Sequence, residues 1–417
     1  MRLVTKLRRY LRVLGPGLIT GASDDDPSGI ATYSQAGAAF GLATLWTALF
    51  TFPLMAGVQE MCARIGLVTR TGLAGTLKAH YPKSITYVML ILTFPAIILN
   101  IGADIQGMGA VSNMLVPQVP VFAFSIAFTA VLMWLIIKFP YQRIARILKW
   151  LCISLLTYFI VPFLIDTPWS SVAEHTFVPT IHWNKEYLAI FVGILGTTIS
   201  PYLFFWQASM EAEDRAERPH QKVMNKRIIR NMIVDVDSGT FFSNAAMLFI
   251  ILTTGIVLHD AGITQIDTVE QAAKALEPLA GRLAYVLFAI GVIGTGLLTI
   301  PVLSGALAYI AAETLGWSEG LNKKFHEARG FYLTMTVALI IGLSLNMLGI
   351  SPIRALIFTA ILYGVTAPVM IGVILHICNN KAIMGEFTNG RWSNILGTAA
   401  LIVMSAAAVA LLYLELF

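Results

Sequence analysis

The sequence predicts an all-α polytopic membrane protein with eleven transmembrane helices, and three observations lead to this class. The 417 residues are 57% hydrophobic and only 12% charged, with a mean hydropathy of +0.75. A soluble domain carries about 25% charged residues, so this chain lacks the charge to cover a soluble surface. Apolar runs long enough to cross a bilayer recur along the whole chain. Two of these runs are interrupted by proline beside polar residues.

A transmembrane helix needs about 20 apolar residues to cross about 30 Å of hydrocarbon. Eleven such runs are centred near residues 26, 53, 98, 129, 156, 198, 243, 297, 340, 365 and 404. We therefore predict a single transmembrane domain over residues 1–417. Its first set of five spans covers residues 11–165, the second covers residues 186–378, and the eleventh helix covers residues 392–415.

The distribution of Lys and Arg predicts the orientation of these spans. Most of the 28 basic residues lie in the N-terminal segment and in alternate loops, and the opposite loops hold only Lys185, Lys274, Arg282 and Arg354. Basic residues collect in cytoplasmic loops. We therefore predict a multi-pass protein of the plasma membrane with a cytoplasmic N-terminus and an extracellular C-terminus. The net charge of +5 then reports orientation, and no nucleic-acid partner is expected.

The first and sixth spans are predicted to be broken near their middle. The first contains three consecutive aspartates that end at Asp26, before Pro27, and the sixth contains Ser200 before Pro201. Proline removes a backbone donor and disfavours helix in the residue before it. The helices should therefore stop near Asp26 and Ser200 and restart at the prolines. Irregular backbone at membrane depth is tolerated only where it packs in protein or lines a water-filled cavity.

The two breaks occupy matching places, because each opens a set of five spans. Paired broken helices in corresponding positions point to a transporter site built on inverted repeats. Ionised carboxylates at the membrane centre are costly and persist where water or a cation compensates them. The alternative, a pair of kinked structural helices, stays open for the sixth span but fits the three aspartates of the first poorly.

At these residues the chain resembles the Nramp family of divalent-metal transporters, which implies the LeuT-type fold with eleven helices. Asp26-Pro27-Ser28-Gly29 falls on the family's D-P-G-N motif, and Thr197 to Tyr202 corresponds to its helix-six pattern A-x-x-M-P-H. Residues 59–74 track the end of helix two, Asp104 lies on the helix-three acid, and residues 237–248 track helix seven. The resemblance implies a transported divalent ion as substrate and no cofactor.

The resemblance also implies a metal site between helices one and six. We assign six candidate metal-site residues: Asp25, Asp26, Gly29, Thr197, Ser200 and Tyr202. Members that move manganese and iron carry asparagine where this chain has Gly29 and methionine where it has Ser200. A thioether favours transition metals, whereas oxygen ligands suit hard cations. The pattern is therefore similar to the Nramp-related magnesium transporters of prokaryotes, with a partly hydrated ion in a wider, oxygen-only site.

The places that serve proton coupling in the family differ here. Coupled members carry histidines after the helix-six proline and a glutamate on helix three, and this chain has Tyr202, Gln207 and Gly107 there. Tyrosine, with a pKa of about 10, and glutamine cannot cycle a proton near neutral pH as histidine can. Asp104 and Asn100 form a polar stripe on helix three, which could carry protons, order water or pair structurally. We predict uncoupled transport.

Other ionisable residues are expected to act outside the metal site. Glu60 and Arg64 are spaced for an i,i+4 pair that serves as a structural link or a gate. Asp235 and Asp237 are expected to start helix seven and to complement its dipole, with gating as the second interpretation. Asp24 is expected either to attract cations beside the site or to be a solvated vestibule acid.

These observations predict a secondary transporter that moves Mg²⁺ and Mn²⁺ by alternating access and has no enzymatic activity. One alternative is a proton-coupled Mn²⁺/Fe²⁺ symporter of the same family. A more distant one is an organic-solute symporter of the LeuT-type fold, whose carboxylate substrate three aspartates would repel. The sequence has no pore-loop signature of a channel. The expected partners are divalent cations and the lipid bilayer; the oligomeric state is not predicted, and a monomer is the starting expectation.

Overall fold

The computed structural model describes residues 15–140, 156–217 and 224–416. In these ranges the chain is helical and has no strand. The helices of the first part are α2 (Pro16–Ala22), α3 (Pro27–Phe40), α4 (Trp46–Thr69), α5 (Leu73–His80), α6 (Lys83–Leu115), α7 (Val121–Lys138), α9 (Leu156–Ile160) and α10 (Trp169–Phe177). The later ones are α11 (Lys185–Thr198), α12 (Pro201–Glu217), α13 (Lys226–Thr254), α14 (Val269–Ala273), α15 (Glu277–Ala280), α16 (Ala284–Leu315), α17 (Arg329–Leu345), α18 (Pro352–Asn379), α19 (Lys381–Met384) and α20 (Arg391–Leu416).

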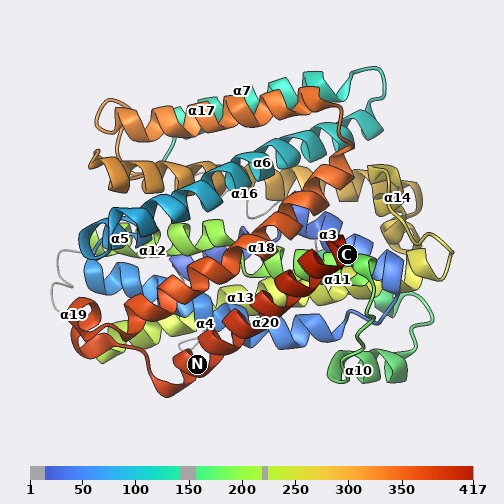
Figure 1. The fold of residues 1–417 in the computed structure, drawn as a ribbon. Helices are drawn as coiled ribbons and strands as arrows, with labels where there is room; N and C mark the ends of the chain where they lie inside the picture. Colours follow the sequence, from blue (N-terminus) through green and yellow to red (C-terminus); the bar gives the residue numbers. More distant parts are fainter. Residues whose placement is uncertain (1–14, 141–155, 218–223, 417) are drawn as a thin grey trace, which may run out of the picture.

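The broken helices lie at the centre of the bundle. Helix α2 packs on α13, and α3 packs on both α11 and α18. The long helix α6 packs against α16, α17, α18 and α7, and Figure 1 shows α7 and α17 as the outermost pair on that side. One end of the molecule carries α5 and α19, and the opposite end carries α10 and α14 (Figure 1). We refer to these as the α5 end and the α10 end.

Eight helical stretches in the described residues are long and apolar enough to cross a membrane. They correspond to the third, fourth and sixth to eleventh predicted spans. The first predicted span is divided into α2 and α3, and the second, α4, carries Glu60 and Arg64 in its second half. The fifth predicted span, centred near residue 156, lies mainly outside the described residues. The count of eleven, the repeat boundaries and the membrane orientation therefore stay predictions.

Glycines allow close contact between the broken helices and their neighbours. A Cβ atom on Gly21 of α2 would lie 2.3 Å from the backbone of Gly239 in α13. A Cβ atom on Gly196 of α11 would lie 2.1 Å from the carbonyl oxygen of Ala360 in α18. Membrane helices associate through such small residues because the hydrophobic effect drives little association in lipid. These contacts fix α2 on α13 and α11 on α18, and so set where the two breaks lie.

Candidate metal centre

Both predicted helix breaks are confirmed. Helix α2 ends at Ala22 and α3 begins at Pro27, with residues 23–26 between them outside either helix. Helix α11 ends at Thr198 and α12 begins at Pro201. Proline is favoured in the first helical turn because its missing N–H needs no partner there. The two prolines therefore restart the helices, and the two breaks lie close together, because α3 packs on α11 and the Tyr202 hydroxyl reaches the Ser23 carbonyl.

Asp26 lies at the start of α3, and both of its carboxylate oxygens have partners. Oδ1 accepts a hydrogen bond of 2.6 Å from the backbone N–H of Gly29, which makes Asp26 the N-cap of α3. Oδ2 accepts a hydrogen bond of 2.9 Å from Nδ2 of Asn100 on α6. The side chain is only 1% exposed. A carboxylate offers about four lone-pair positions, so these two bonds orient Asp26 and leave it able to bind a cation.

Gly29 is surrounded by oxygen atoms from both broken helices. A Cβ atom at this glycine would lie 3.1 Å from Oγ1 of Thr197, 3.3 Å from the carbonyl oxygen of Asp24 and 3.3 Å from Oδ1 of Asp26. Even one added carbon atom would be tighter than ordinary van der Waals contact with these three oxygen atoms. With glycine, a hydroxyl, a carbonyl and a carboxylate oxygen face the same small region.

Ser200 and Tyr202 each use their hydroxyl proton on a backbone carbonyl. Ser200 Oγ donates to the carbonyl oxygens of Thr197 at 2.6 Å and Gly196 at 2.9 Å. Tyr202 Oη donates at 2.9 Å to the carbonyl of Ser23 in the other break, which also accepts from Thr299 at 3.1 Å. The lone pairs of both hydroxyl oxygens remain available to water or to a cation. Tyr202 therefore links the two breaks directly.

The three consecutive aspartates do not face the same way. Ser243 Oγ on α13 donates to Asp24 Oδ2 at 2.6 Å and approaches Asp25 Oδ1 at 3.3 Å, whereas Asp26 is held by α6. Asp24 and Asp25 are 0% and 6% exposed. Across the described residues, no three His, Cys, Asp or Glu side chains converge as a ready metal site. An ion at this break would therefore not be held by three acidic side chains, and carbonyl, hydroxyl or water oxygens would complete its ligands.

Two residues of α18 beside Asp26 were not among the sequence candidates. Thr359 Oγ1 donates a hydrogen bond of 2.9 Å to Oδ1 of Asn100, so a chain Thr359–Asn100–Asp26 joins three helices. Tyr363, one turn after Thr359, is 1% exposed, and its ring centre lies 5.7 Å from that of Tyr202. Their spacing of four residues inside an apolar run is the pattern that could have identified them.

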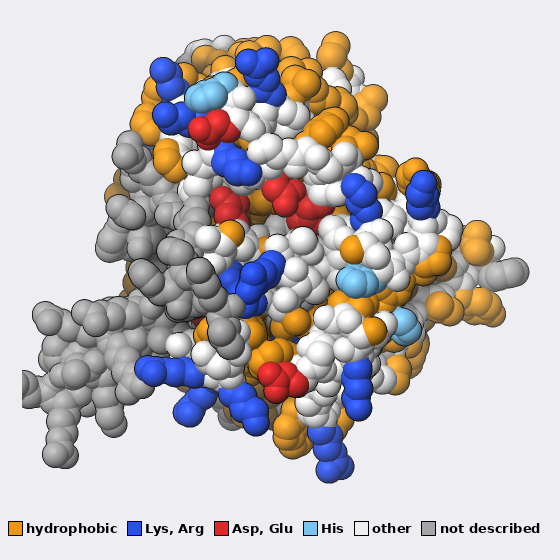
Figure 2. Space-filling model, turned by 90° about the vertical axis from the view of Figure 1, so that its left-hand side faces the viewer, with side chains coloured by type: hydrophobic (Ala, Val, Ile, Leu, Met, Phe, Trp, Pro, Cys, Tyr) orange, Lys and Arg blue, Asp and Glu red, His pale blue; other side chains and the backbone are white. Residues whose placement is uncertain are grey.

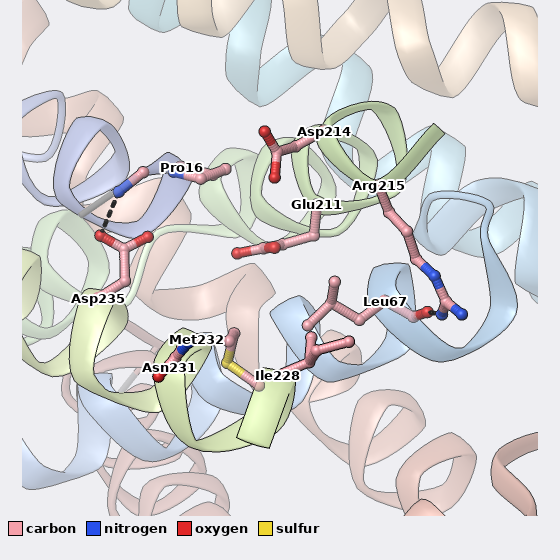
Figure 3. Close-up of a pocket in the computed structure, with 10 residues that line it drawn as sticks. Pro16, Leu67, Glu211, Asp214, Arg215, Ile228, Asn231, Met232 and Asp235 are labelled. Atoms are coloured by element: carbon pink, nitrogen blue, oxygen red, sulfur yellow. Dashed lines mark hydrogen bonds between the residues drawn. The ribbon is translucent and has the colours of Figure 1, made fainter. Parts of the chain in front are cut away.

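A pocket of about 70 Å³ lies between α2, α12 and α13, toward the α5 end. Figure 3 shows Glu211, Asp214 and Asp235 around it. The surface of the α5 end is hollowed and carries acidic side chains within the hollow, which Figure 2 does not assign to individual residues. Glu211 accepts a hydrogen bond of 3.0 Å from Gln207, whose amide oxygen accepts one from Thr20 of α2. Buried polar groups therefore lead from this pocket to the first break. The break itself is closed to solvent in this conformation.

Comparison with known families identifies the chain. The family model described as natural resistance-associated macrophage protein-like matches residues 17–414. The chain belongs to the Nramp family. Over 99% of its length this Nramp protein is 27% identical to the divalent metal cation transporter MntH of Caldanaerobacter subterraneus subsp. tengcongensis, of which the match covers 95%.

Solved structures agree on the fold of this Nramp protein. It superposes on the Eremococcus coleocola manganese transporter with a TM-score of 0.76 and 17% identity, covering 97% of this chain and 86% of that one. The match to MhsT, solved in complex with L-phenylalanine, has a TM-score of 0.61 and 12% identity, and covers 96% of this chain and 97% of that one. The predicted LeuT-type fold is confirmed by these similarities.

Proposed function

We propose that this Nramp protein is a secondary transporter that moves Mg²⁺ and Mn²⁺ across the plasma membrane by alternating access. The ion binds in partly hydrated form between the breaks of α2–α3 and α11–α12. A relative named as a divalent metal cation transporter and the structural similarity to a manganese transporter support the broad part of the proposal, divalent metal transport. The inclusion of Mg²⁺ rests on the chemistry of the break.

The oxygen atoms around Gly29 carry the proposal. Thr197 Oγ1, the Asp24 carbonyl and Asp26 Oδ1 lie 3.1–3.3 Å from the point where a side chain of Gly29 would begin. Hydroxyl, carbonyl and carboxylate oxygens suit hard cations such as Mg²⁺ and Mn²⁺. Mg²⁺ gives up its water reluctantly and usually binds through one or two carboxylates plus water. Glycine places no side chain among these oxygen atoms, and the ion keeps part of its water there.

The residues at the family's proton-coupling places support uncoupled transport. Tyr202 donates its proton to the Ser23 carbonyl, and Gln207 bridges Thr20 and Glu211. The atoms nearest to a Cβ atom on Gly107 would be those of the apolar residues Leu356 and Pro27. Neither tyrosine nor glutamine titrates near neutral pH, and glycine has no side chain that could carry a proton. The ion gradient and an inside-negative potential drive uptake, and a divalent ion gains about 4.6 kcal/mol per 100 mV.

A second candidate is proton-coupled Mn²⁺ or Fe²⁺ transport. One observation favours it: the sulfur of Met247 on α13 lies 3.6 Å from Oγ1 of Thr198, beside the break of the sixth span. Thr198 precedes that break, so a soft donor is close to the α11 side of the site. An organic-solute symporter with the same fold is less compatible, because Asp24, Asp25 and Asp26 would repel a substrate carboxylate.

Uptake of Mn²⁺ into liposomes containing the purified full-length protein tests the proposal, with Mg²⁺ added as competitor. We expect Mg²⁺ to slow Mn²⁺ uptake in a saturable manner. Asp26→Ala should abolish uptake of both ions, and Glu174→Ala, which removes an exposed carboxylate on α10, should behave as the wild type. Unchanged Mn²⁺ uptake in excess Mg²⁺ would contradict the shared site, and wild-type uptake by Asp26→Ala would remove Asp26 from it.

A further inference from the structure

One face of α6 lies against the break in the first span. Asn100, Asp104 and Gly107 are spaced by four and three residues, so they share this face. Asn100 Nδ2 lies 2.9 Å from Asp26 Oδ2, and a Cβ atom on Gly107 would lie 3.7 Å from Cβ of Pro27. Asn100 therefore contacts Asp26, and the backbone of Gly107 lies near Pro27, at the α3 side of the break. The side chain of Asp104, on the same helix face, is directed toward the break in the first span.

Asp104 is a buried carboxylate that the rest of the described chain compensates only weakly. The residue is 0% exposed, and neither Oδ1 nor Oδ2 forms a hydrogen bond of ordinary length and angle among the described residues, although the backbone N–H of Ser28 makes a weak contact with the carboxyl group. An unpaired buried carboxylate is costly unless a proton, water or a cation accompanies it. This side chain is thus in the state expected of a ligand whose partner is not part of the polypeptide.

A second unpaired polar group lies on the neighbouring face of α18. Thr359 bonds to Asn100 at 2.9 Å, and Tyr363 follows it by one helical turn on the same face. The hydroxyl of Tyr363 is buried, lies near Asn100 and forms no hydrogen bond of ordinary length and angle in the described part of the chain. Asp104 and Tyr363 therefore bring three unsatisfied polar atoms to the α6–α18 side of Asp26. Gly29 bonds to the other carboxylate oxygen of Asp26, Oδ1, and Thr197 lies beside Gly29.

We propose that Asp104 is a second carboxylate of the ion site and, together with the Tyr363 hydroxyl, binds the water shell of the ion on the side away from Gly29. Two carboxylates balance the charge of a divalent cation, and Mg²⁺ characteristically uses one or two carboxylates together with retained water. This inference rests on one part of the proposed function, the binding of a divalent cation by Asp26, and adds a second carboxylate to the same site.

Equilibrium binding of Mn²⁺ to the full-length protein in detergent, measured by calorimetry, tests this assignment. Asp104→Asn keeps the size of the side chain and removes its charge, and we expect it to weaken Mn²⁺ binding by about tenfold or more, as expected for loss of one charged ligand. Tyr363→Phe, which removes one hydroxyl, should weaken binding by a smaller factor. Glu313→Gln is the matched control, because Glu313 is a helix-borne carboxylate bonded to Gly75 and Ser209, remote from Asp26 in its contacts. It should keep wild-type affinity.

The alternative roles of Asp104 give different results. If Asp104 only supports the fold, Asp104→Asn lowers the unfolding temperature but binds Mn²⁺ with wild-type affinity, which overturns the proposal. If Asp104 only carries protons, Mn²⁺ affinity is unchanged and metal-dependent proton entry disappears, which also overturns it. If Asp104→Asn does not fold, Mn²⁺ affinity is measured for Tyr363→Phe and Asp104→Glu instead. Weaker binding supports the proposal, and wild-type affinity in both variants overturns it. Failure of Mg²⁺ to compete, with weakened Mn²⁺ binding in Asp104→Asn, would contradict the proposed Mg²⁺ transport and leave this inference supported.

Discussion

Asp235 Oδ2 on α13 lies 2.7 Å from the backbone nitrogen of Gly17 on α2 and accepts its hydrogen bond. The other carboxylate oxygen accepts from the backbone N–H groups of Gly15 at 2.7 Å and Leu18 at 3.1 Å. The first N–H groups of a helix have no partner within it and favour negative charge. The Asp235 carboxylate supplies α2 with hydrogen-bond acceptors and with a negative charge at its N-terminus. The expectation that Asp235 and Asp237 start helix seven was wrong, because α13 begins at Lys226 and both residues lie inside it.

We expect Asp235→Ala to loosen α2 from α13, because the variant removes three hydrogen bonds and leaves three backbone donors unpaired. A cysteine placed at Thr20, which is 2% exposed, reports this change through its rate of reaction with a thiol reagent. Cys62 and Cys378 are buried, and Cys152, outside the described residues, is replaced by Ser in the background. Labelling should be faster in the Asp235→Ala background. Equal rates in both backgrounds would show that this contact does not hold α2.

The chain Thr359–Asn100–Asp26 predicts a role for Asn100 in positioning Asp26. Asn100→Leu removes the donor to Asp26 Oδ2, so we expect KM for Mn²⁺ uptake to rise by about tenfold, since loss of a hydrogen bond to a charged group costs about 1.5–3 kcal/mol. Thr359→Val should raise KM less, and Thr359→Ser, which keeps the hydroxyl, should restore the wild-type value. A fall in maximum rate with unchanged KM in all three variants would argue against positioning.

Selectivity should respond to the two departures from the manganese-type pattern. Gly29→Asn together with Ser200→Met introduces a soft sulfur donor and fills the space beside Thr197 Oγ1. We expect Mg²⁺ to compete less well with Mn²⁺ in this double variant. Its total activity is expected to fall, because larger side chains in a packed region cause strain. Competition by Mg²⁺ that equals the wild type would show that these two positions do not set selectivity.

Glu319, in the loop after α16, gives a pH-dependent prediction for the α5 end. Burial, and next the charge of Glu313, raise the pKa of Glu319 to about 8. Above about pH 5 the unfolded chain has lost this proton while the folded chain keeps it, so the free energy of unfolding falls as pH rises toward about 8. Glu319→Gln cannot titrate. Its unfolding temperature should fall less than that of the wild type over this interval, and parallel pH profiles would contradict the assignment.

The sequence predicted the two breaks well because proline acts locally on the backbone. Pro27 and Pro201 begin α3 and α12 as expected. The partners of the aspartates depend on packing between distant segments. Nothing near Asp24 in the sequence indicates Ser243, and nothing near Asp235 indicates the start of α2. Asn100 was predicted as part of a polar stripe, but its bond to Asp26 becomes evident only when α6 and α3 are placed together.

The central claim is that the ion moves without a coupled proton through a site that accepts Mg²⁺. The most direct measurement is Mg²⁺ uptake into proteoliposomes of the wild-type protein with an inside-negative potential, while luminal Mg²⁺ and luminal pH are recorded together. The account predicts saturable Mg²⁺ entry that follows the voltage, leaves luminal pH unchanged and is absent in Asp26→Ala. Acidification of the lumen in step with metal entry, or no entry of Mg²⁺ while Mn²⁺ enters, would contradict it.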